Sequence, residues 1–179
     1  MRKIIVYIAT SADGYIARPD GGIDWLNRPR PKGNYGMGEF LKSVDTILWG
    51  RKTYDLAVAM GAPDGGCASM KSFVFSAHPP AAPAPKAVTF VGEPVVDFLK
   101  TLRRARGKNV WVMGGASLIA SLLDAGGIDE FIIHVVPTMI GEGIPLVRPR
   151  HRTIALDLKS VKKFSDGVAR LHYGVRRRT

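Results

Sequence analysis

The chain has 179 residues, with 26 lysines and arginines against 15 acidic residues, a net charge of +11 and one cysteine. This length suffices for one domain over residues 1–179. Such a domain buries about 70% of its unfolded surface and needs no disulfide bond or metal ion to be stable. The lone Cys67 excludes an internal disulfide and favours a reducing, cytoplasmic location, the four histidines show no metal-ligand spacing, and no apolar run approaches the roughly 20 residues of a membrane span.

Strand-like and helix-like patterns alternate along the first half of the chain. Short β-branched or aromatic runs predict buried strands, whereas apolar residues spaced i, i+3, i+4 and i+7, as at Met37, Phe40, Leu41 and Val44, predict a helix. The elements expected in order are a strand over 3–10, a loop rich in Asp, Gly and Pro over 11–22, a helix over 37–44, a strand over 46–49, a helix over 51–60 and a Gly-rich loop to 69.

The second half continues the alternation and ends in a hairpin. Four prolines in residues 78–85 exclude both a helix and a central strand there. The elements expected in order are strands over 72–76 and 88–91, a helix from Glu93-Pro94, a strand over 110–113, a helix over 116–125, a strand over 131–136, a loop over 137–151 and a hairpin of 154–164 with 168–175. The sum is a three-layer α/β fold with helices on both faces of a mostly parallel sheet that an antiparallel C-terminal hairpin closes.

Two strand-to-helix turns are rich in glycine. Gly50-Arg51-Lys52-Thr53 follows the strand over 46–49, and Gly114-Gly115-Ala116-Ser117 follows the strand over 110–113. Such turns bind phosphate, because glycine admits close approach and the free N–H groups and dipole of the helix favour negative charge. Any α/β protein also needs tight turns of this kind. Arg51 and Lys52 favour the functional interpretation, a dinucleotide shared by both turns, although no GxGxxG fingerprint is present.

The positive charge suggests nucleic acid as an alternative partner. Basic clusters occur around Arg104, Arg150 and Arg177, but the first lies on a helix face and the last at the chain end, and no aromatic residues interleave with them. An anionic small molecule suits the same charge. We therefore expect no nucleic-acid partner, and a basic nucleic-acid-binding accessory protein stays as the alternative.

Six motifs in register resemble dihydrofolate-reductase-like proteins over essentially the whole chain, most of all the branch that contains the reductase domain of riboflavin biosynthesis. They are Ser11-Ala12-Asp13-Gly14-Tyr15-Ile16-Ala17, Asp24-Trp25, Trp49-Gly50-Arg51-Lys52-Thr53-Tyr54, Val74-Phe75-Ser76, Val112-Met113-Gly114-Gly115-Ala116-Ser117-Leu118 and Asp129-Glu130 through Gly143. The resemblance implies hydride transfer from NADPH to a pteridine- or aminopyrimidine-type molecule, as in 5-amino-6-(5-phosphoribosylamino)uracil reductase or dihydrofolate reductase.

The resemblance also implies where the cofactor lies. Ala9 and Ile16 match positions that border the nicotinamide, and Arg51 and Ser76 match positions that bind the 2′-phosphate, where a guanidinium favours NADPH over NADH. The full set implied for cofactor binding is Ala9, Ile16, Gly50, Arg51, Lys52, Thr53, Ser76, Met113, Gly114, Gly115, Ala116, Ser117 and Leu118.

The chain departs from the family pattern where dihydrofolate reductases carry a carboxylate on the first helix. That position is Gly36 here, so a pterin edge would lack its ionic partner, which argues against dihydrofolate as the substrate. The candidate catalytic residues are Asp24, Trp25 and Glu39. Asp24 is equally suited to capping a turn, an exposed position is the commoner outcome for a residue such as Glu39, and Trp25 is expected to touch the site. A nucleotide-binding protein without catalysis is the second alternative, and family resemblance suggests a homodimer.

Overall fold

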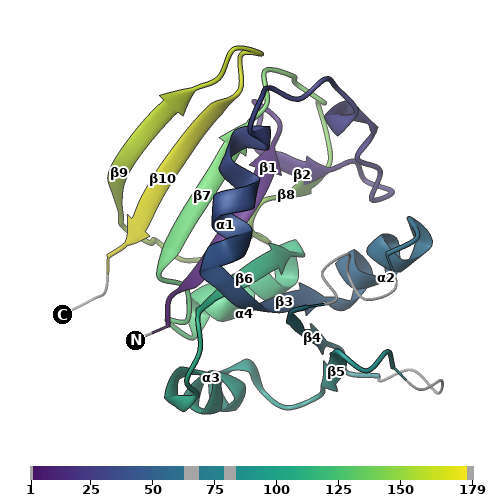
Figure 1. Cartoon of the computed structure of the whole chain (residues 1–179), viewed down its shortest axis with the longest axis vertical. Coiled ribbons are helices and arrows are strands. Elements are labelled where there is room, and N and C mark those ends of the chain that lie inside the picture. Colours follow the sequence, from purple (N-terminus) through teal and green to yellow (C-terminus); the bar gives the residue numbers. More distant parts are fainter. Residues whose placement is uncertain (1, 63–68, 79–83, 177–179) are drawn as a thin grey trace.

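Eight strands form one sheet in this computed structural model, which describes residues 2–62, 69–78 and 84–176 (Figure 1). The strands are β1 (Ile4–Thr10), β3 (Val44–Gly50), β4 (Lys71–Phe75), β5 (Val88–Val91), β6 (Asn109–Gly114), β7 (Glu130–Val135), β9 (Leu156–Lys163) and β10 (Ala169–Val175). Their order is β5-β4-β3-β6-β1-β7-β10-β9. Neighbours from β5 to β7 are parallel, and β10 is antiparallel to both β7 and β9. The predicted sheet is confirmed.

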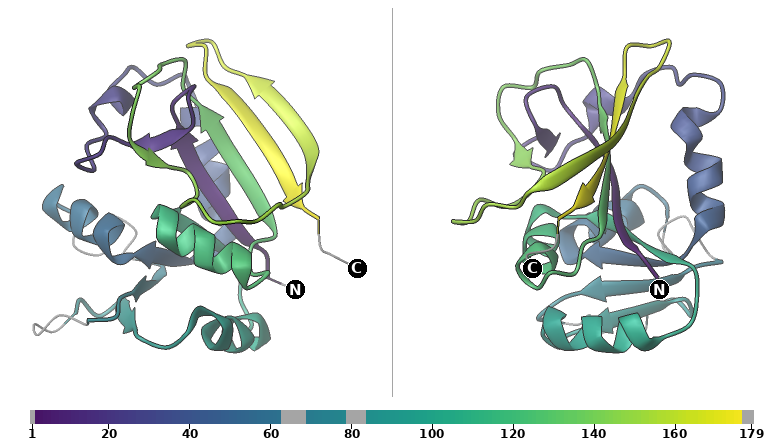
Figure 2. Two further views of the ribbon diagram at one scale, coloured as in Figure 1. Left: turned by 180° about the vertical axis from the view of Figure 1, so that it is seen from behind. Right: turned by 90° about the vertical axis from the view of Figure 1, so that its left-hand side faces the viewer.

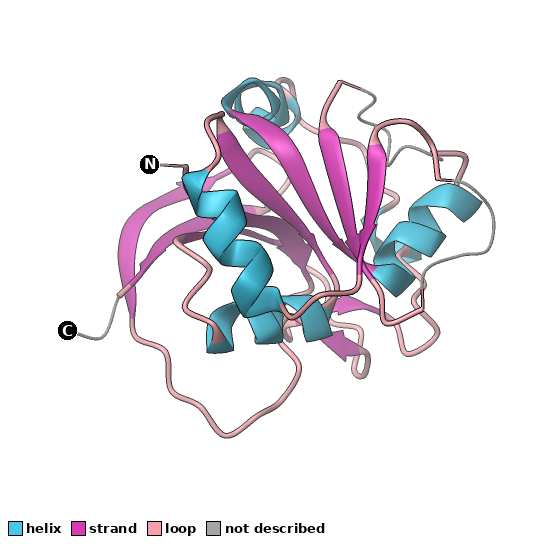
Figure 3. Ribbon diagram, turned by 90° about the horizontal axis from the view of Figure 1, so that it is seen from below, coloured by secondary structure: helices cyan, strands magenta, loops and turns pink. Residues whose placement is uncertain are grey.

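Four helices cover the two faces of the sheet. They are α1 (Met37–Ser43), α2 (Arg51–Ala59), α3 (Val95–Arg104) and α4 (Ala116–Asp124). Residues of α1 and α2 pack around Trp49 and Trp111 on one face, whereas residues of α3 and α4 pack around Leu48 and Val112 on the other. Figure 2 shows α1 and α4 on opposite sides of the sheet, and Figure 3 shows the twist of its strands. The predicted three layers are therefore present. Among the described residues, no helix is long and apolar enough to cross a membrane.

Two elements differ from the sequence prediction. Val44 was expected on the helix stripe, but it has extended dihedrals and starts β3, where it pairs with Asn109 of β6. The sheet ladder overrides the helical spacing at this residue. The loops over 11–22 and 137–151 contain β2 (Tyr15–Ala17) and β8 (Ile144–Pro145), which pair with each other and are too short to show alternation. Short 3-10 turns η1 (Asp24–Leu26) and η2 (Asn34–Gly36) precede α1. Cys67 lies outside the described residues.

A buried carboxylate joins the C-terminal hairpin to the rest of the sheet. Glu130, at the start of β7, accepts hydrogen bonds from Lys3 Nζ at 2.8 Å and Lys159 Nζ at 2.6 Å, and its other oxygen lies 3.1 Å from His172 Nε2. Burial raises the pKa of this carboxyl, but the hydrogen bonds outweigh burial and bring the pKa down to about 2. Lys3, directly before β1, and residues of β7, β9 and β10 are thus held together at one carboxylate.

Candidate active site

The two glycine turns touch each other at the carboxyl ends of neighbouring strands. Trp49 of β3 pairs with Gly114 of β6. A Cβ on Gly50 would lie 3.3 Å from the carbonyl oxygen of Gly114, and a Cβ on Gly115 would lie 3.2 Å from Thr53 Oγ1. These contacts leave no room for side chains between the turns, so the two turns pack directly against each other.

Both turns lead into helix N-termini that carry no side-chain cap. Helix α2 begins at Arg51 and α4 at Ala116, and neither has a capping hydrogen bond from a side chain. The first N–H groups of each helix therefore have no helical partner, and the positive ends of both helix dipoles meet at the same edge of the sheet. Two such ends side by side suit a ligand with a diphosphate.

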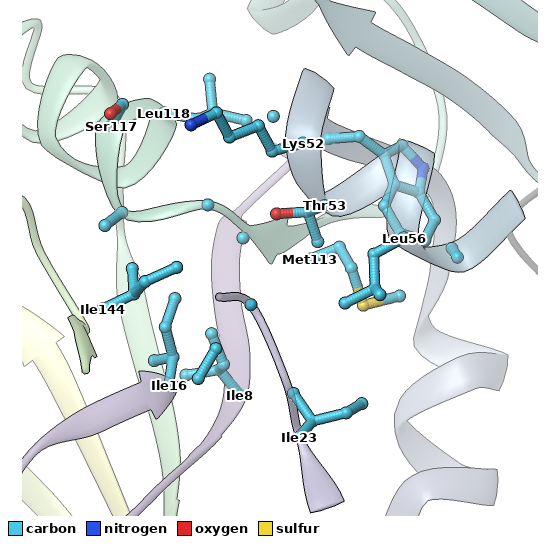
Figure 4. A pocket seen from close by; sticks show the side chains of 18 of the residues that line it. Ile8, Ile16, Ile23, Lys52, Thr53, Leu56, Met113, Ser117, Leu118 and Ile144 are labelled. Atoms are coloured by element: carbon cyan, nitrogen blue, oxygen red, sulfur yellow. The ribbon is translucent and has the colours of Figure 1, made fainter. Parts of the chain in front are cut away.

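A cavity of about 1760 Å³ runs across the carboxyl ends of the strands, and its lining includes every residue predicted to bind the cofactor. These are Ala9, Ile16, Gly50, Arg51, Lys52, Thr53, Ser76, Met113, Gly114, Gly115, Ala116, Ser117 and Leu118. Figure 4 shows Lys52 reaching from α2 toward Ser117 and Leu118 of α4, while Ile8, Ile16, Ile23 and Ile144 line the apolar floor. The sequence pattern thus gathers residues from five separate segments around one space.

Arg51 and Ser76 meet at the backbone of His78. Arg51 Nη1 donates to the His78 carbonyl at 3.2 Å, Ser76 Oγ donates to the same carbonyl at 2.7 Å, and the His78 N–H donates to Ser76 Oγ at 3.2 Å. Arg51 Nε also donates to both carboxylate oxygens of Asp55, and its guanidinium lies 5.4 Å from the centre of the Phe90 ring. The guanidinium is held in one orientation at the edge of the cavity, as recognition of a phosphate requires.

The three candidate catalytic residues do not line this cavity. Asp24 is exposed and accepts two hydrogen bonds from Arg18, at 2.6 and 2.9 Å, which lower the pKa of its carboxyl. Trp25 is only 8% exposed and packs with Val136 and Val168 in a small core beneath the loop. Glu39 is exposed on α1. The structure thus places Asp24 in an ion pair, Trp25 in a small core and Glu39 on the exposed face of a helix, and their catalytic role stays a prediction.

The cavity continues past β1 to a second end that the sequence patterns did not reveal. Tyr7 of β1, His134 of β7 and Tyr35 line it, and His134 pairs with Ala9 across the strands. The His134 ring lies 4.8 Å from the Tyr7 ring and 5.7 Å from the Tyr35 ring. The only signal in the sequence was one histidine inside an apolar strand. Spacing rules for metal ligands do not detect a single histidine.

Tyr35 closes this end in a backbone conformation that is uncommon for residues other than glycine. Asn34 and Tyr35 have φ of 43° and 58°, and the flanking Gly33 and Gly36 are also left-handed. Tyr35 Oη donates to Asp166 Oδ2 at 2.5 Å. Arg28 donates to the carbonyl of Asp166 at 2.6 Å. The tip of the hairpin β9–β10 therefore holds the segment before α1 against the cavity.

His134 is the most perturbed histidine near the site. It is 5% exposed and its Nε2 has no hydrogen-bond partner. Burial, and then the charge of Arg170, lower the pKa of His134 to about 4, so the ring is neutral at physiological pH.

We expect the free energy of unfolding to fall as the pH drops from about 6.5 toward 4, because the unfolded chain binds a proton at residue 134 that the folded protein excludes. In H134Q this component is absent. Chemical denaturation at a series of pH values should give a wild-type loss up to about 3 kcal/mol larger than that of H134Q at pH 4. Equal losses in the two proteins would contradict the buried neutral state.

Comparison with known proteins agrees with this geometry. The model of the RibD C-terminal domain family matches residues 2–170. The chain belongs to this family. Uncharacterized protein YwjB of Bacillus subtilis is 38% identical over 172 residues, which cover 96% of this chain and 97% of YwjB.

Two solved structures share the fold of this RibD C-terminal domain. A protein of Shewanella sp. PV-4, provisionally named a riboflavin biosynthesis protein, has a TM-score of 0.84 at 29% identity and covers 98% of this chain and 99% of its own. Dihydrofolate reductase of Enterococcus faecalis, solved with NADP(H), has a TM-score of 0.66 at 14% identity and covers 98% of this chain and 97% of its own. The fold is thus dihydrofolate-reductase-like, and the family supports a function of the reductase type.

Proposed function

We propose that this protein is an NADPH-dependent reductase that transfers a hydride to a small heteroaromatic molecule of the pteridine or aminopyrimidine type. The observation that carries the proposal is the contact between two uncapped glycine turns at one edge of a long cavity. Family membership and the shared fold of a dihydrofolate reductase solved with NADP(H) add support.

The residues present fit a dinucleotide phosphate. The turns Gly50–Thr53 and Gly114–Leu118 would hold the diphosphate through backbone N–H groups and Lys52, while Arg51 and Ser76 would bind the 2′-phosphate. When bound, NADPH would supply the hydride. Ile8, Ala9 and Ile16 line an apolar part of the cavity that excludes water and fixes the orientation of a flat ring.

A panel of reductase assays tests the proposal. Purified protein should consume NADPH, seen as loss of absorbance at the nicotinamide band, in the presence of at least one dihydropterin or ribosylaminopyrimidine. Binding of NADPH without oxidation across the panel would favour a nucleotide-binding protein that lacks catalysis.

A substitution of Arg51 tests the preference for NADPH over NADH most directly. In R51Q we expect the affinity for NADPH to fall about tenfold or more and the affinity for NADH to stay the same, because the 2′-phosphate is the part of the cofactor that the lost guanidinium would bind. D55N is the matched control, since it removes the carboxylate that neutralises Arg51 and should preserve or strengthen the NADPH preference. Titration of nicotinamide fluorescence measures both cofactors. Equal loss for NADPH and NADH in R51Q would refute the assignment.

We also propose that the protein acts as a cytoplasmic homodimer. Edge strand β9 is exposed along its whole length, and its apolar Leu158 and Val161 are 57% and 60% exposed. An exposed apolar edge strand is a surface that another chain can cover.

A further inference from the structure

A half-buried arginine, Arg170, lies behind the wall of the second end of the cavity. Arg170 of β10 is the cross-strand partner of His134, which lines the cavity. Its Nε is buried and has no hydrogen-bond partner, and its Nη1 lies 3.3 Å from where a Cβ on Gly36 would be. Among residues 2–62, 69–78 and 84–176, no carboxylate forms an ion pair with Arg170.

The charge of Arg170 acts on two of the polar side chains that line this end, those of His134 and Tyr7. It lowers the pKa of His134 in addition to the effect of burial. For Tyr7, burial raises the pKa and the charge of Arg170 opposes it, with the result at about 12. A neutral imidazole with an unpartnered Nε2 and a phenol therefore form a cavity wall with a half-buried positive charge behind it.

In the part of the chain that the structure describes, no acidic side chain pairs with this charge from the elements around it. Asp166 is bound to Tyr35 and Arg28, and Glu39 of α1 is exposed. Among the described residues that line the cavity, Asp20 and Glu93 are the acidic ones. The basic ones are Arg28, Arg30, Arg51, Lys52 and Arg148. Arg170 is half-buried and its buried Nε has no partner, which costs free energy that a ligand anion would offset.

We propose that this end of the cavity, with Arg170 behind His134 and Tyr7, is a subsite for a negatively charged oxygen group on a flat heteroaromatic substrate. The inference deepens the proposed function and rests on it for the neighbouring cofactor. The group is a carboxylate or an ionised ring oxygen. Amino-substituted rings without such an oxygen bind poorly here, because the positive charge behind this wall repels their positive edge.

Pyrimidine probes of similar size test the subsite without the cofactor. Orotate carries a carboxylate, barbiturate an ionised ring oxygen, uracil no charge and 2,4-diaminopyrimidine a basic edge. We expect orotate or barbiturate to bind the wild type roughly tenfold or more tightly than uracil, and diaminopyrimidine least, as measured by tryptophan fluorescence of the free protein. Trp111 lines the cavity and provides the signal. Whichever anion binds identifies the source of the charge.

Two sets of variants assign the preference to Arg170. R170Q should lose the anion preference, whereas R104Q, which removes an exposed arginine of α3, should keep it. If R170Q does not fold, G36D places a carboxylate beside Arg170 and should abolish the preference, while G36N has the same shape without the charge and should keep it. Asp and Asn are also the residues that best tolerate the φ of +85° at Gly36.

The proposal is overturned if neither anion binds the wild type better than uracil at millimolar concentrations, or if the preference survives in both R170Q and G36D. These outcomes are separate from those of the proposed function. A protein that prefers orotate but does not bind NADPH would retain the subsite and lose the reductase, and a protein that binds NADPH but shows no anion preference would do the reverse.

Discussion

Replacing Gly115 with alanine is expected to weaken NADPH binding by about 10- to 100-fold, the largest effect of any methyl group that can be added to the glycine turns. Gly115 has φ of +47°, and its Cβ would lie 3.2 Å from Thr53 Oγ1. The methyl would therefore enter the space between the two turns and push apart the N–H groups that would face the diphosphate. The strained backbone would also cost about 1 to 3 kcal/mol of stability.

Gly126 supplies the matched control. It ends α4 with φ of +62°, and a Cβ there would meet no atom within 4 Å. G126A should lose a comparable amount of stability through backbone strain and still bind NADPH like the wild type. Fluorescence titration and thermal melting of both variants separate the two effects. If G115A binds NADPH as tightly as G126A does, the two turns do not hold the phosphates.

Replacing Gly143 with alanine is expected to lower reductase activity at least about tenfold and to cost about 2 to 4 kcal/mol of stability. A Cβ at Gly143 would lie 2.2 Å from the carbonyl oxygen of Ala17 and 3.2 Å from both Tyr15 Cβ and Ile140 Cδ1. The first contact is with backbone, so β2 and β8 would have to separate. Ile16 and Ile144 line the cavity from this strand pair, and the apolar wall would be displaced with it.

Gly141, two residues earlier in the same loop, tests whether the effect comes from this contact. It has φ of +79° and open space around a Cβ, and its N–H, which alanine retains, donates to Asp13 at 2.8 Å. G141A should lose about 1 kcal/mol and keep its activity. Steady-state rates and denaturant unfolding measure both quantities. Similar activity in G143A and G141A would show that the β2–β8 pair does not shape the site.

Local sequence patterns predicted the elements whose structure depends on their own residues. The β-branched run before Gly50 and the apolar run before Gly114 predicted β3 and β6, and glycine predicted the turns that follow them. Because parallel strands end at one edge of a sheet, both turns were expected to share a ligand, and the structure places them in contact.

The same local patterns could not predict which strands pair when the strands lie far apart in the sequence. The strand pair β2–β8 joins segments more than a hundred residues apart and is too short to alternate. Arg170 is a half-buried charge only because β10 lies beside β7, and nothing around residue 170 marks it as special. Likewise Asp24 and Trp25 occupy a family motif, yet the fold uses one for an ion pair with Arg18 and the other for a small core.

Calorimetric titration of NADPH into the purified protein tests the central claim most directly, since the account depends on one nucleotide lying across the two glycine turns. We predict one NADPH per chain, with a dissociation constant in the micromolar range and a clearly weaker one for NADH. Absence of binding heat at millimolar NADPH, with the protein folded, would contradict the assignment of the cavity and with it the reductase function.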